Sequence, residues 1–169
     1  DASLRGLKVA LIEAHDFAAA TSAHNSKLAH GGLRYLRELE FGLVRESLRE
    51  RRNLLRIAPH LVRPLPFLFP IDGGIANRAY VEAGLTLYDL LSFDRNFGLE
   101  DPAQRLPGHR WLNRKAALAR EPVLEAPGFQ GAFEYHDAQM YSPERIALEN
   151  LIDADAHVGA IANKLAAEK

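Results

Sequence analysis

A carboxylate, several hydroxyls, a lysine, a histidine and two glycines follow one another near the start of this chain. Glu13 closes the apolar run Val9–Ile12, whose β-branched residues indicate a strand. The segment from Thr21 to Leu36, TSAHNSKLAHGGLRYL, comes next. An acid at the carboxyl end of such a strand can accept hydrogen bonds from ribose hydroxyls, and the polar, glycine-containing segment after it can lie against phosphates or a flat ring. This order of groups is typical of a nucleotide cofactor site.

The glycine-rich turn that usually accompanies such an acid is missing ahead of it. A G-x-G-x-x-G turn normally lies about 20 residues upstream, and only twelve residues precede Glu13. Asp1–Gly6 is typical of the last turn of a helix, because glycine at its end adopts the left-handed conformation easily. We therefore expect that a first strand, a glycine turn and most of a helix are absent from the front, and that the chain is a fragment.

His30, Gly31 and Gly32 form the sharpest element of the segment. Two adjacent glycines remove side chains where a backbone must approach something flat, and an imidazole stands beside them. Arg34 and Tyr35 follow directly, which adds a planar cation with several donors and a phenol. Taken alone, an H-G-G string favours a simple turn, and Arg34 favours an ion pair at the start of a helix.

The segment resembles the amino-terminal region of FAD-dependent glycerol-3-phosphate dehydrogenases. The resemblance is carried by TSAHNSKLAHGGLRYL, by VALIEAHDF before it and by RESLRERRNLLRIAPHLVRPLPF after it. A second block, GAFEYHDAQMYSPERIALENL, also resembles that family, and the similarity runs from Leu4 to Asn163. The sequence departs from the commoner pattern at Ala23, His24 and Asn25, where a serine-rich string is usual.

The resemblance implies an α/β fold, an incomplete Rossmann-like FAD-binding domain of the D-amino-acid-oxidase-like flavoprotein type with an inserted helical segment. Residues 1–169 then form one partial FAD-binding domain. Its parts are the cofactor-binding strand and loop at 1–36, a helical and loop insertion at 37–128, and a return to the sheet at 129–169.

The resemblance also implies roles for individual residues. Those expected to bind FAD are Glu13, Thr21, Ser22, Ser26, Lys27, Leu28, His30, Gly31 and Gly32. Within this set Glu13 accepts from the ribose, Thr21 and Ser22 meet the pyrophosphate, and Lys27 stabilises negative charge beside the flavin. Arg34 and Tyr35 hold the substrate phosphate. The family's general base lies beyond Lys169, so no catalytic residue is expected in this chain.

Several of these residues also have a plain structural explanation. Glu13 can be an exposed acid and Lys27 a surface lysine. Thr21 and Ser22 can be ordinary caps of a helix that follows them. The sequence alone leaves these alternatives open.

The activity implied by the resemblance is oxidation of sn-glycerol 3-phosphate to dihydroxyacetone phosphate by hydride transfer to FAD. Electrons then pass to quinone, or to oxygen in related oxidases. Two alternatives stay open: another FAD-dependent amine or hydroxyacid oxidoreductase, which would not need Arg34, and an inactive fragment that binds no cofactor. We expect the isolated chain to be inactive, because the glycine turn that holds the pyrophosphate is missing. A homodimer, a cytoplasmic location and peripheral contact with the cytoplasmic face of the membrane complete the expectation.

Composition narrows the classes of site and partner. The formal net charge of −1 gives no reason to expect nucleic acid binding, and the basic cluster Arg49, Arg51 and Arg52 is typical of a solvated helix face. There is no cysteine, and the seven histidines show no metal-ligand spacing, so we expect no metal. No apolar run approaches the roughly 20 residues of a membrane span. Arg78–Phe93 is either a core helix or an interfacial or partner-binding segment.

Local patterns predict the elements that position the site. Arg34–Ile57 has the apolar spacing of one long amphipathic helix, and Phe67–Phe69 is at most a short strand or edge piece among prolines. Asp137 and Arg145 are expected to be a structural pair. The remaining predicted elements are a short helix capped by Asn113, a strand over Gln130–His136, a helix that begins at Ser142-Pro143-Glu144, and a strand over Gly159–Asn163.

Overall fold

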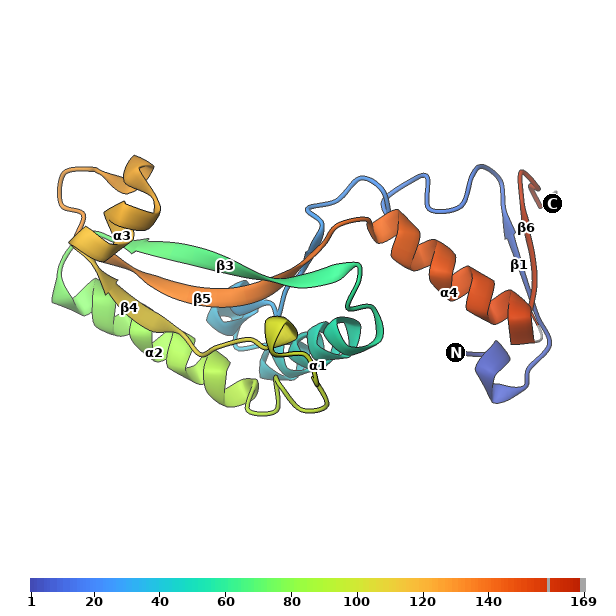
Figure 1. Cartoon of the computed structure of the whole chain (residues 1–169), viewed down its shortest axis with the longest axis horizontal. Coiled ribbons are helices and arrows are strands. Elements are labelled where there is room, and N and C mark those ends of the chain that lie inside the picture. The colour runs from blue at the N-terminus through green and yellow to red at the C-terminus, as the bar shows by residue number, and fades with distance from the viewer. Residues whose placement is uncertain (158, 168–169) are drawn as a thin grey trace. The chain divides into compact units, whose positions relative to one another are not determined.

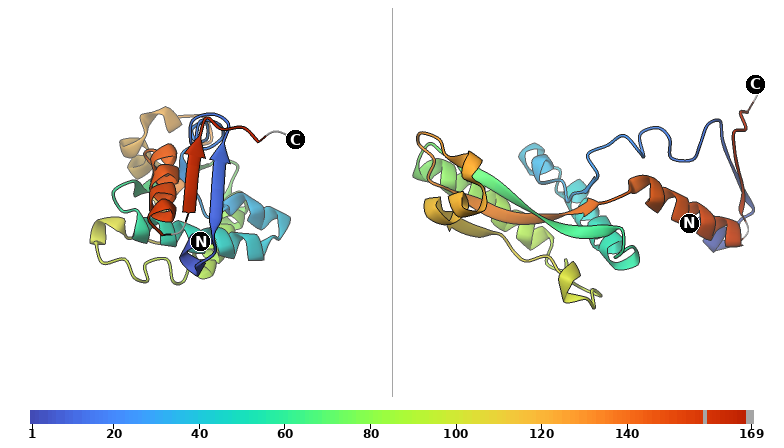
Figure 2. Two further views of the ribbon diagram at one scale, coloured as in Figure 1. Left: turned by 90° about the vertical axis from the view of Figure 1, so that its right-hand side faces the viewer. Right: turned by 45° about the horizontal axis from the view of Figure 1, so that its top comes forward.

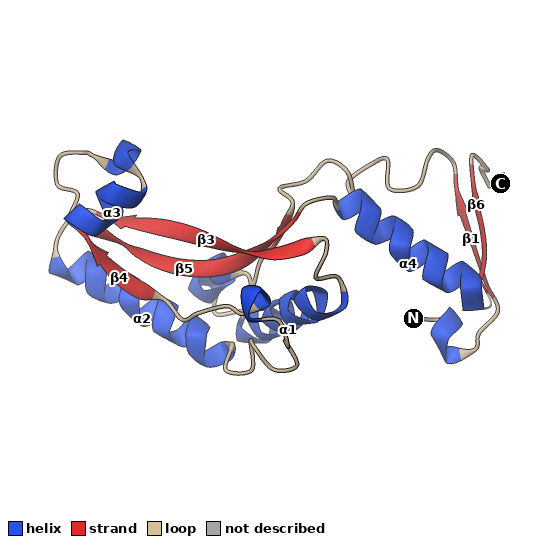
Figure 3. Cartoon of the chain, in the orientation of Figure 1, coloured by secondary structure: helices blue, strands red, loops and turns tan. Residues whose placement is uncertain are grey.

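A computed structural model describes residues 1–157 and 159–167 of the chain. It divides into two compact units. The terminal unit combines the two end segments, Asp1–Lys27 and Met140–Lys169, and the central unit is Leu28–Gln139. Figure 1 labels the α-helices and most of the strands, and Figure 3 distinguishes the helices from the strands.

The terminal unit contains a parallel strand pair and a helix. β1 (Val9–Glu13) pairs with β6 (Gly159–Asn163), and Glu13 lies opposite Asn163 at the carboxyl ends of both strands. Figure 2 shows the two arrows side by side and pointing the same way. Both predicted strands are therefore confirmed. The predicted last turn at the start of the chain is the 3-10 helix η1 (Ser3–Arg5), which Gly6 ends in a left-handed conformation with φ of 77°.

Helix α4 (Pro143–His157) leads into β6 and begins where the sequence predicts. The Ser142 carbonyl accepts the backbone N–H of Arg145 at 3.1 Å, and the Ser142 hydroxyl donates to a Glu144 carboxylate oxygen at 2.7 Å. This hydrogen bond lowers the pKa of Glu144. An acid near the positive end of the helix dipole adds to the same effect.

The central unit is built on strand β5 (Gly131–Met140). β3 (Val62–Ile71) is its neighbour in the sheet, and the short strands β2 (Leu28–Ala29) and β4 (Arg110–Asn113) pair with it antiparallel, near its end and its start respectively. The predicted strand over Gln130–His136 is thus confirmed and is longer than expected. Its first four residues, Gly131–Glu134, are all buried, because apolar clusters cover both faces of the sheet.

Helices pack the two faces of this sheet. On one face, α1 (Phe41–Ile57) and α2 (Ile75–Leu91) contribute Val44, Leu48, Tyr88 and Leu85 to the core. The other cluster contains Ala117 of α3 (Arg114–Arg120), a helix whose predicted cap is confirmed by Asn113 Oδ1, which accepts the Ala116 N–H at 3.0 Å. Two further 3-10 helices, η3 (Pro102–Gln104) and η4 (Pro122–Leu124), lie in the connections.

The single helix predicted over Arg34–Ile57 is wrong, because the chain breaks at Leu39. A 3-10 helix, η2 (Leu33–Glu38), ends at Leu39, whose backbone is left-handed with φ of 60°, and α1 then begins at Phe41. The apolar spacing runs across the break because η2 and α1 pack their apolar side chains into the same cluster. The regular spacing of apolar residues over Arg34–Ile57 therefore reflects a shared hydrophobic cluster, and not one continuous helix.

The prediction for Phe67–Phe69, a short strand or edge piece, is wrong in length, because β3 is a ten-residue strand, and is confirmed in its edge position. The strand contains Pro64, Pro66 and Pro70, and a proline cannot donate to a strand ladder. In the sheet, β3 lies at the end of the described strand order, beside β5 alone. An edge position lets the strand keep its prolines.

The basic cluster of α1 is not simply a solvated face. Arg51 is 2% exposed, and Arg52 pairs with Asp94. Arg45 donates two hydrogen bonds to the same Asp94 carboxylate, at 2.7 and 2.8 Å. These hydrogen bonds, with the nearby positive charge of Arg52, lower the pKa of Asp94. The interpretation as a solubilising run therefore fails for Arg51 and Arg52.

Helix α2 has one core face and one exposed apolar face. Leu85 and Tyr88 are 2% and 3% exposed, as expected of a core helix. Ile75, Tyr80 and Leu90 are 85%, 66% and 66% exposed. Within the described residues, the helices are too short or too polar to cross a membrane.

Candidate functional site

The acid of the candidate site lies where the sequence predicts, at the carboxyl end of β1. Glu13 is partly buried, and its Oε1 accepts the backbone N–H of His15 at 2.9 Å. The Glu13 carbonyl accepts the Leu165 N–H at 3.0 Å, so hydrogen bonds fix both the backbone and the side chain of this residue. The side chain is thus a hydrogen-bond acceptor at a defined strand end, with the chemistry that a ribose diol requires.

The loop after β1 is organised by Asn25, one of the residues that departs from the family pattern. Asn25 Nδ2 donates to the carbonyls of Thr21 and Ser22 at 3.0 and 2.8 Å, and its Oδ1 accepts the Lys27 N–H at 2.7 Å. Lys27 is held in a left-handed conformation with φ of 56°. The segment forms turns and not a helix, so the explanation of Thr21 and Ser22 as helix caps is wrong. Their side chains and that of Ser26 are exposed.

The H-G-G element belongs to the central unit and connects β2 to η2. Leu28 lies in β2 opposite Gln139, His30 is exposed, and the two glycines are buried. Gly32 precedes η2 with φ of 75°, a conformation that favours glycine. The His30 imidazole is therefore exposed to solvent, while the backbone of the two glycines that follow it is buried.

The need for glycine at position 31 comes from packing inside the central unit. A Cβ at Gly31 would overlap the hydroxyl of Tyr88 and a methyl of Leu48, and it would lie 2.8 Å from Tyr88 Cζ. The tight approach that the sequence indicates is real, and the described contact is with an aromatic side chain of α2. Contact of this element with a flavin ring stays a prediction.

A buried polar network, formed by Arg51, Asp137 and Tyr88, lies behind Gly31. Asp137 Oδ1 accepts the Gly31 N–H at 3.0 Å and the Tyr88 hydroxyl at 2.7 Å, and it pairs with Arg51 Nη1. Arg51 Nη1 also donates to the His136 carbonyl at 3.0 Å. The three side chains come from β5, α1 and α2, and each is at most 4% exposed. Burial raises the pKa of Tyr88 well above its usual range, and the negative charge of Asp137 acts in the same direction.

Sequence reasoning missed this network, although α1 carries a signal for it. Arg51 occupies a position in the buried stripe that also contains Val44, Leu48 and Leu55. A charged residue in an apolar stripe needs a buried partner. The predicted pair of Asp137 with Arg145 is wrong: Asp137 binds Arg51, and Arg145 Nε donates to Glu149 Oε1 at 3.0 Å, one turn along α4.

Arg34 and Tyr35 lie in η2, directly after the glycines. Tyr35 is partly buried and packs against the cluster of Val44, Leu48 and Tyr88. Arg34 is exposed and makes no hydrogen bond or ion pair with any residue in 1–157 or 159–167. The explanation of Arg34 as one half of an ion pair thus has no support, and its guanidinium donors are available.

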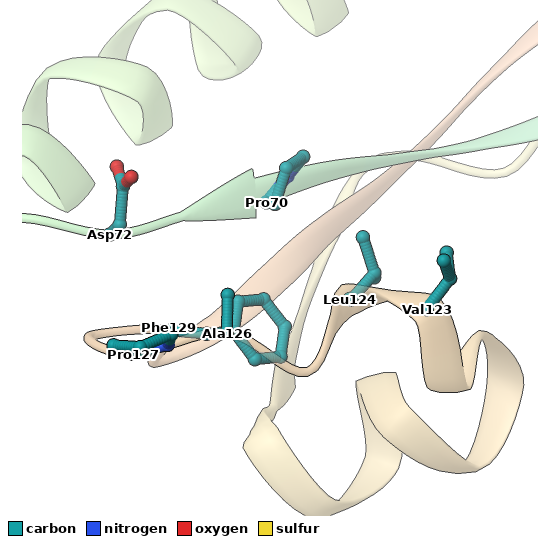
Figure 4. Close-up of a pocket in the computed structure, with 7 residues that line it drawn as sticks. All are labelled: Pro70, Asp72, Val123, Leu124, Ala126, Pro127 and Phe129. Carbon is teal, nitrogen blue, oxygen red and sulfur yellow. The ribbon is translucent and has the colours of Figure 1, made fainter.

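Metal-binding clusters and pockets are the other kinds of site that the described part of the chain could hold. Within it, no group of three or more His, Cys, Asp or Glu side chains could hold a metal ion. A shallow pocket of the central unit is drawn in Figure 4, between the end of β3 and the segment around η4, and is lined mostly by apolar residues with Asp72 at one side. None of the predicted site residues lines it.

Comparison with known proteins shows which family the chain belongs to. Residues 1–168 match the family described as FAD dependent oxidoreductase. The chain belongs to that family. The resemblance to FAD-dependent glycerol-3-phosphate dehydrogenases is confirmed by relatives of that name, one 44% identical from Synechocystis and one 49% identical from Mycobacterium leprae. The similarity to these two covers 98% and 81% of this chain but 29% and 22% of the relatives, so the chain spans less than a third of their length.

Two solved structures of FAD-bound or amino-acid-oxidising enzymes, as their names describe them, share the fold. An L-alpha-glycerophosphate oxidase from Mycoplasma pneumoniae with FAD bound matches 92% of this chain and 38% of its own, with a TM-score of 0.53 at 15% identity. A glycine oxidase from Bacillus cereus matches 96% of this chain and 42% of its own, with a TM-score of 0.50 at 17% identity. The expected α/β class, a Rossmann-like FAD-binding fold of the D-amino-acid-oxidase type, is confirmed.

Proposed function

We propose that this chain forms the FAD-contacting part of an enzyme that oxidises sn-glycerol 3-phosphate to dihydroxyacetone phosphate. The observation that supports the proposal best is the exposed guanidinium of Arg34, free of partners within the described residues, next to the His30–Gly32 backbone. A guanidinium can bind a phosphate through two parallel hydrogen bonds and keeps its proton near neutral pH. A substrate without phosphate would not require it.

The donors and acceptors of the chain fit FAD. Glu13 supplies an acceptor for the ribose hydroxyls, and the exposed hydroxyls of Thr21, Ser22 and Ser26 supply donors for the pyrophosphate oxygens. When bound, FAD supplies the hydride acceptor of the reaction. Lys27 places a cation where negative charge develops, and Leu28 together with the His30–Gly32 backbone packs beside the ring. Arg34 and Tyr35 orient the substrate through its phosphate.

A chimaeric enzyme tests the role of Arg34. Residues 1–168 would replace the matching segment of the Synechocystis glycerol-3-phosphate dehydrogenase, and steady-state kinetics would compare variants at position 34. Loss of a charge-assisted hydrogen-bond pair in Arg34→Ala should raise the KM for glycerol 3-phosphate roughly tenfold to a hundredfold, with partial recovery in Arg34→Lys.

Arg37→Ala is the matched control, because Arg37 is an exposed arginine of the same 3-10 helix. Its KM should stay near that of the parent chimaera. An Arg34→Ala variant with unchanged KM would contradict the phosphate role and would favour the alternative, an FAD-dependent amine or hydroxyacid oxidoreductase.

The proposal includes the fate of the electrons and the inactivity of the isolated chain. Quinone is the acceptor we propose, and oxygen is the alternative; anaerobic turnover of the chimaera with a soluble quinone, compared with peroxide formation in air, separates them. The isolated chain should show no turnover, because it lacks the glycine turn that supplies pyrophosphate-binding amides. Its visible spectrum after incubation with FAD and removal of free cofactor shows whether it retains flavin at all.

A peripheral membrane contact, a cytoplasmic location and a homodimer are further parts of the proposal. The exposed apolar residues of α2, Ile75, Tyr80 and Leu90, support an interfacial contact, since such side chains favour a lipid boundary over water. Co-sedimentation of the chimaera with phospholipid vesicles tests the contact, and a Leu90→Glu variant should reduce it. Light scattering gives the oligomeric state, and fractionation of the source cell gives the location.

A further inference from the structure

We infer that Asp137 is a positioning residue, which holds the His30–Gly32 backbone in the conformation that meets the flavin. The inference rests on the proposed function, in which this backbone packs beside the ring. Asp137 itself is buried and lies behind the loop, so it acts through Gly31 and not by touching substrate.

The first step is the hydrogen bond from the loop. The Gly31 N–H donates to Asp137 Oδ1 at 3.0 Å, across 106 residues of sequence. Bonds to an ionised acceptor are stronger than neutral ones, and a buried amide that loses its acceptor has no water to replace it. This bond therefore fixes the middle residue of the loop to β5.

The second step is the charge that keeps Asp137 in place. Arg51 pairs with the same oxygen that accepts the Gly31 N–H, and both side chains are almost fully buried. Arg51 Nε has no hydrogen-bond partner within the described residues, while Arg51 Nη1 donates to Asp137 Oδ1, to the His136 carbonyl at 3.0 Å and to the Tyr88 hydroxyl at 3.2 Å. Asp137 is the charged group among these partners, and a buried cation needs an ionised partner to offset the loss of its hydration.

The third step is the steric wall. The Tyr88 hydroxyl donates to Asp137 Oδ1 at 2.7 Å and fills the space that a side chain on residue 31 would need. One hydrogen bond, from Gly31 to Asp137, therefore anchors the loop to β5. The Tyr88 side chain prevents the loop from moving further into the core. Together these contacts fix the backbone that carries the exposed His30 and the start of η2.

The test compares amide exchange in the whole chain with FAD binding, and binding is measured both in this chain and in a version extended upstream by a glycine-rich turn. Asp137→Asn keeps the shape of the side chain and removes its charge. Exchange of the Gly31 amide, followed by NMR, should become at least about tenfold faster, and the dissociation constant for FAD, from flavin fluorescence, should rise roughly tenfold to a hundredfold. The circular dichroism of bound flavin should also change, since it reports how the ring is held.

Asp94→Asn is the matched control, because, like Asp137→Asn, it removes a carboxylate that pairs with arginine in the central unit. Asp94 binds Arg45 and Arg52 and, among the residues described, has no hydrogen bond to the loop. It should leave Gly31 exchange and FAD binding near those of the unmodified chain. Two more variants guard against a failure to fold. Tyr88→Phe leaves both charges paired and should give a smaller effect of the same kind, and Arg51→Met combined with Asp137→Asn leaves no unpaired buried charge.

The outcomes separate this inference from the proposed function. If the unsubstituted chain, alone or extended by a glycine-rich turn, binds FAD while Asp137→Asn, Tyr88→Phe and the double variant in the same form bind it equally well, the positioning role is overturned and the cofactor proposal stands. If the unmodified chain and a version extended by a glycine-rich turn both fail to bind FAD, the cofactor proposal is overturned. Faster Gly31 exchange together with weaker FAD binding in the Asp137 variants supports both.

Discussion

Gly31 has two structural roles in this fold, one through its missing side chain and one through its amide. Its missing side chain leaves room for Tyr88 and Leu48, and its amide binds a buried carboxylate. The sequence pattern pointed to a close approach at this glycine, and the approach exists. Its partner could not be foreseen, because Tyr88 and Asp137 lie far along the chain and carry no local signal that links them to the loop.

Substitution at Gly31 should therefore destabilise the fold whether or not a cofactor is bound. In Gly31→Ala the new methyl group overlaps Tyr88 and Leu48, and overpacking of this kind costs about 1–3 kcal/mol. Urea unfolding followed by far-UV circular dichroism measures the change. Gly42→Ala is the control: apart from its chain neighbours and the adjacent backbone of its own helix, no atom lies within 4 Å of its added Cβ, and helix α1 should gain at most about 0.5–1 kcal/mol. Equal stability of the two variants would contradict the described packing.

At the scale of elements, the break between η2 and α1 is the feature that the sequence hid. A leucine is an unusual residue for a left-handed position, and Leu39 is 70% exposed, so its side chain gains little from packing. The conformation is nevertheless held by its N–H, which donates to the carbonyls of Leu36 and Tyr35. No glycine marks the boundary, and pattern reading joined the two helices.

Glycine at this boundary should stabilise the chain. Leu39→Gly removes the left-handed strain and should raise the free energy of unfolding by about 0.5–1 kcal/mol, after the larger entropy loss of glycine is counted. Leu43→Gly, at another exposed leucine but inside α1, should lower it by about 1 kcal/mol or more. Chemical denaturation of both variants distinguishes the boundary from a helix interior; a loss of stability in Leu39→Gly would argue for a continuous helix.

A second link between elements should appear as pH dependence. Hydrogen bonds from Arg45, with the charge of Arg52, lower the pKa of Asp94 below its ordinary value of 3.8. The folded state then binds this proton less readily than the unfolded state. The stabilisation is complete above pH 3.8 and is lost as the pH falls through the lower, folded-state pKa. Asp94→Asn should therefore be less stable than the unmodified chain at neutral pH, and the difference should shrink in acid.

Urea unfolding at several pH values between neutrality and strong acid measures this difference. Asp72→Asn serves as the comparison, because Asp72 is exposed and its side chain forms no ion pair in the part of the chain described. Its stability should follow that of the unmodified chain across the range. A difference for Asp94→Asn that stays constant into acid would rule out the ion pairs as its cause.

At the scale of the whole molecule, the chain divides into two compact units. The central unit, Leu28–Gln139, is continuous in sequence and contains all three apolar clusters described above, together with the buried Arg51–Asp137–Tyr88 network. The terminal unit is assembled from the two ends of the chain. A continuous segment with its own core has what it needs to fold alone.

We therefore expect residues 28–139 to fold when expressed without the ends. The segment should unfold in one cooperative urea transition, and its near-UV circular dichroism should show the ordered environments of Tyr88 and Trp111. The two end segments joined by a short linker are the counterpart, and their single strand pair and helix should give a far less cooperative transition. A 28–139 segment without near-UV signal would contradict an independent core.

The sequence predicted the elements with strong local signals and missed those fixed by distant partners. The start of α4 at Ser142-Pro143-Glu144, the Asn113 cap and the strand ending at Glu13 each depend on a few neighbouring residues, and each is confirmed. The ten-residue length of β3 and the burial of Arg51 depend on β5. The roles of Glu13, Thr21, Ser22, Ser26 and Lys27 toward FAD stay predictions, because they depend on a ligand.

The prolines of β3 have a consequence for how separate molecules meet. The Ile71 carbonyl accepts the N–H of Gln130, the residue directly before β5, at 2.9 Å, so the backbone groups of Ile71 face β5. Residues two apart along a strand direct their backbone N–H and C=O groups to the same side. Pro64, Pro66 and Pro70 therefore fall on the opposite side, at the outer edge of the described sheet, where Leu68 alone among the alternate residues 64–70 has an N–H. An incoming strand would find acceptors but almost no donors there. We therefore expect this edge to resist pairing with a strand of another molecule because its prolines have no backbone N–H to donate, and not because charged side chains repel a neighbour.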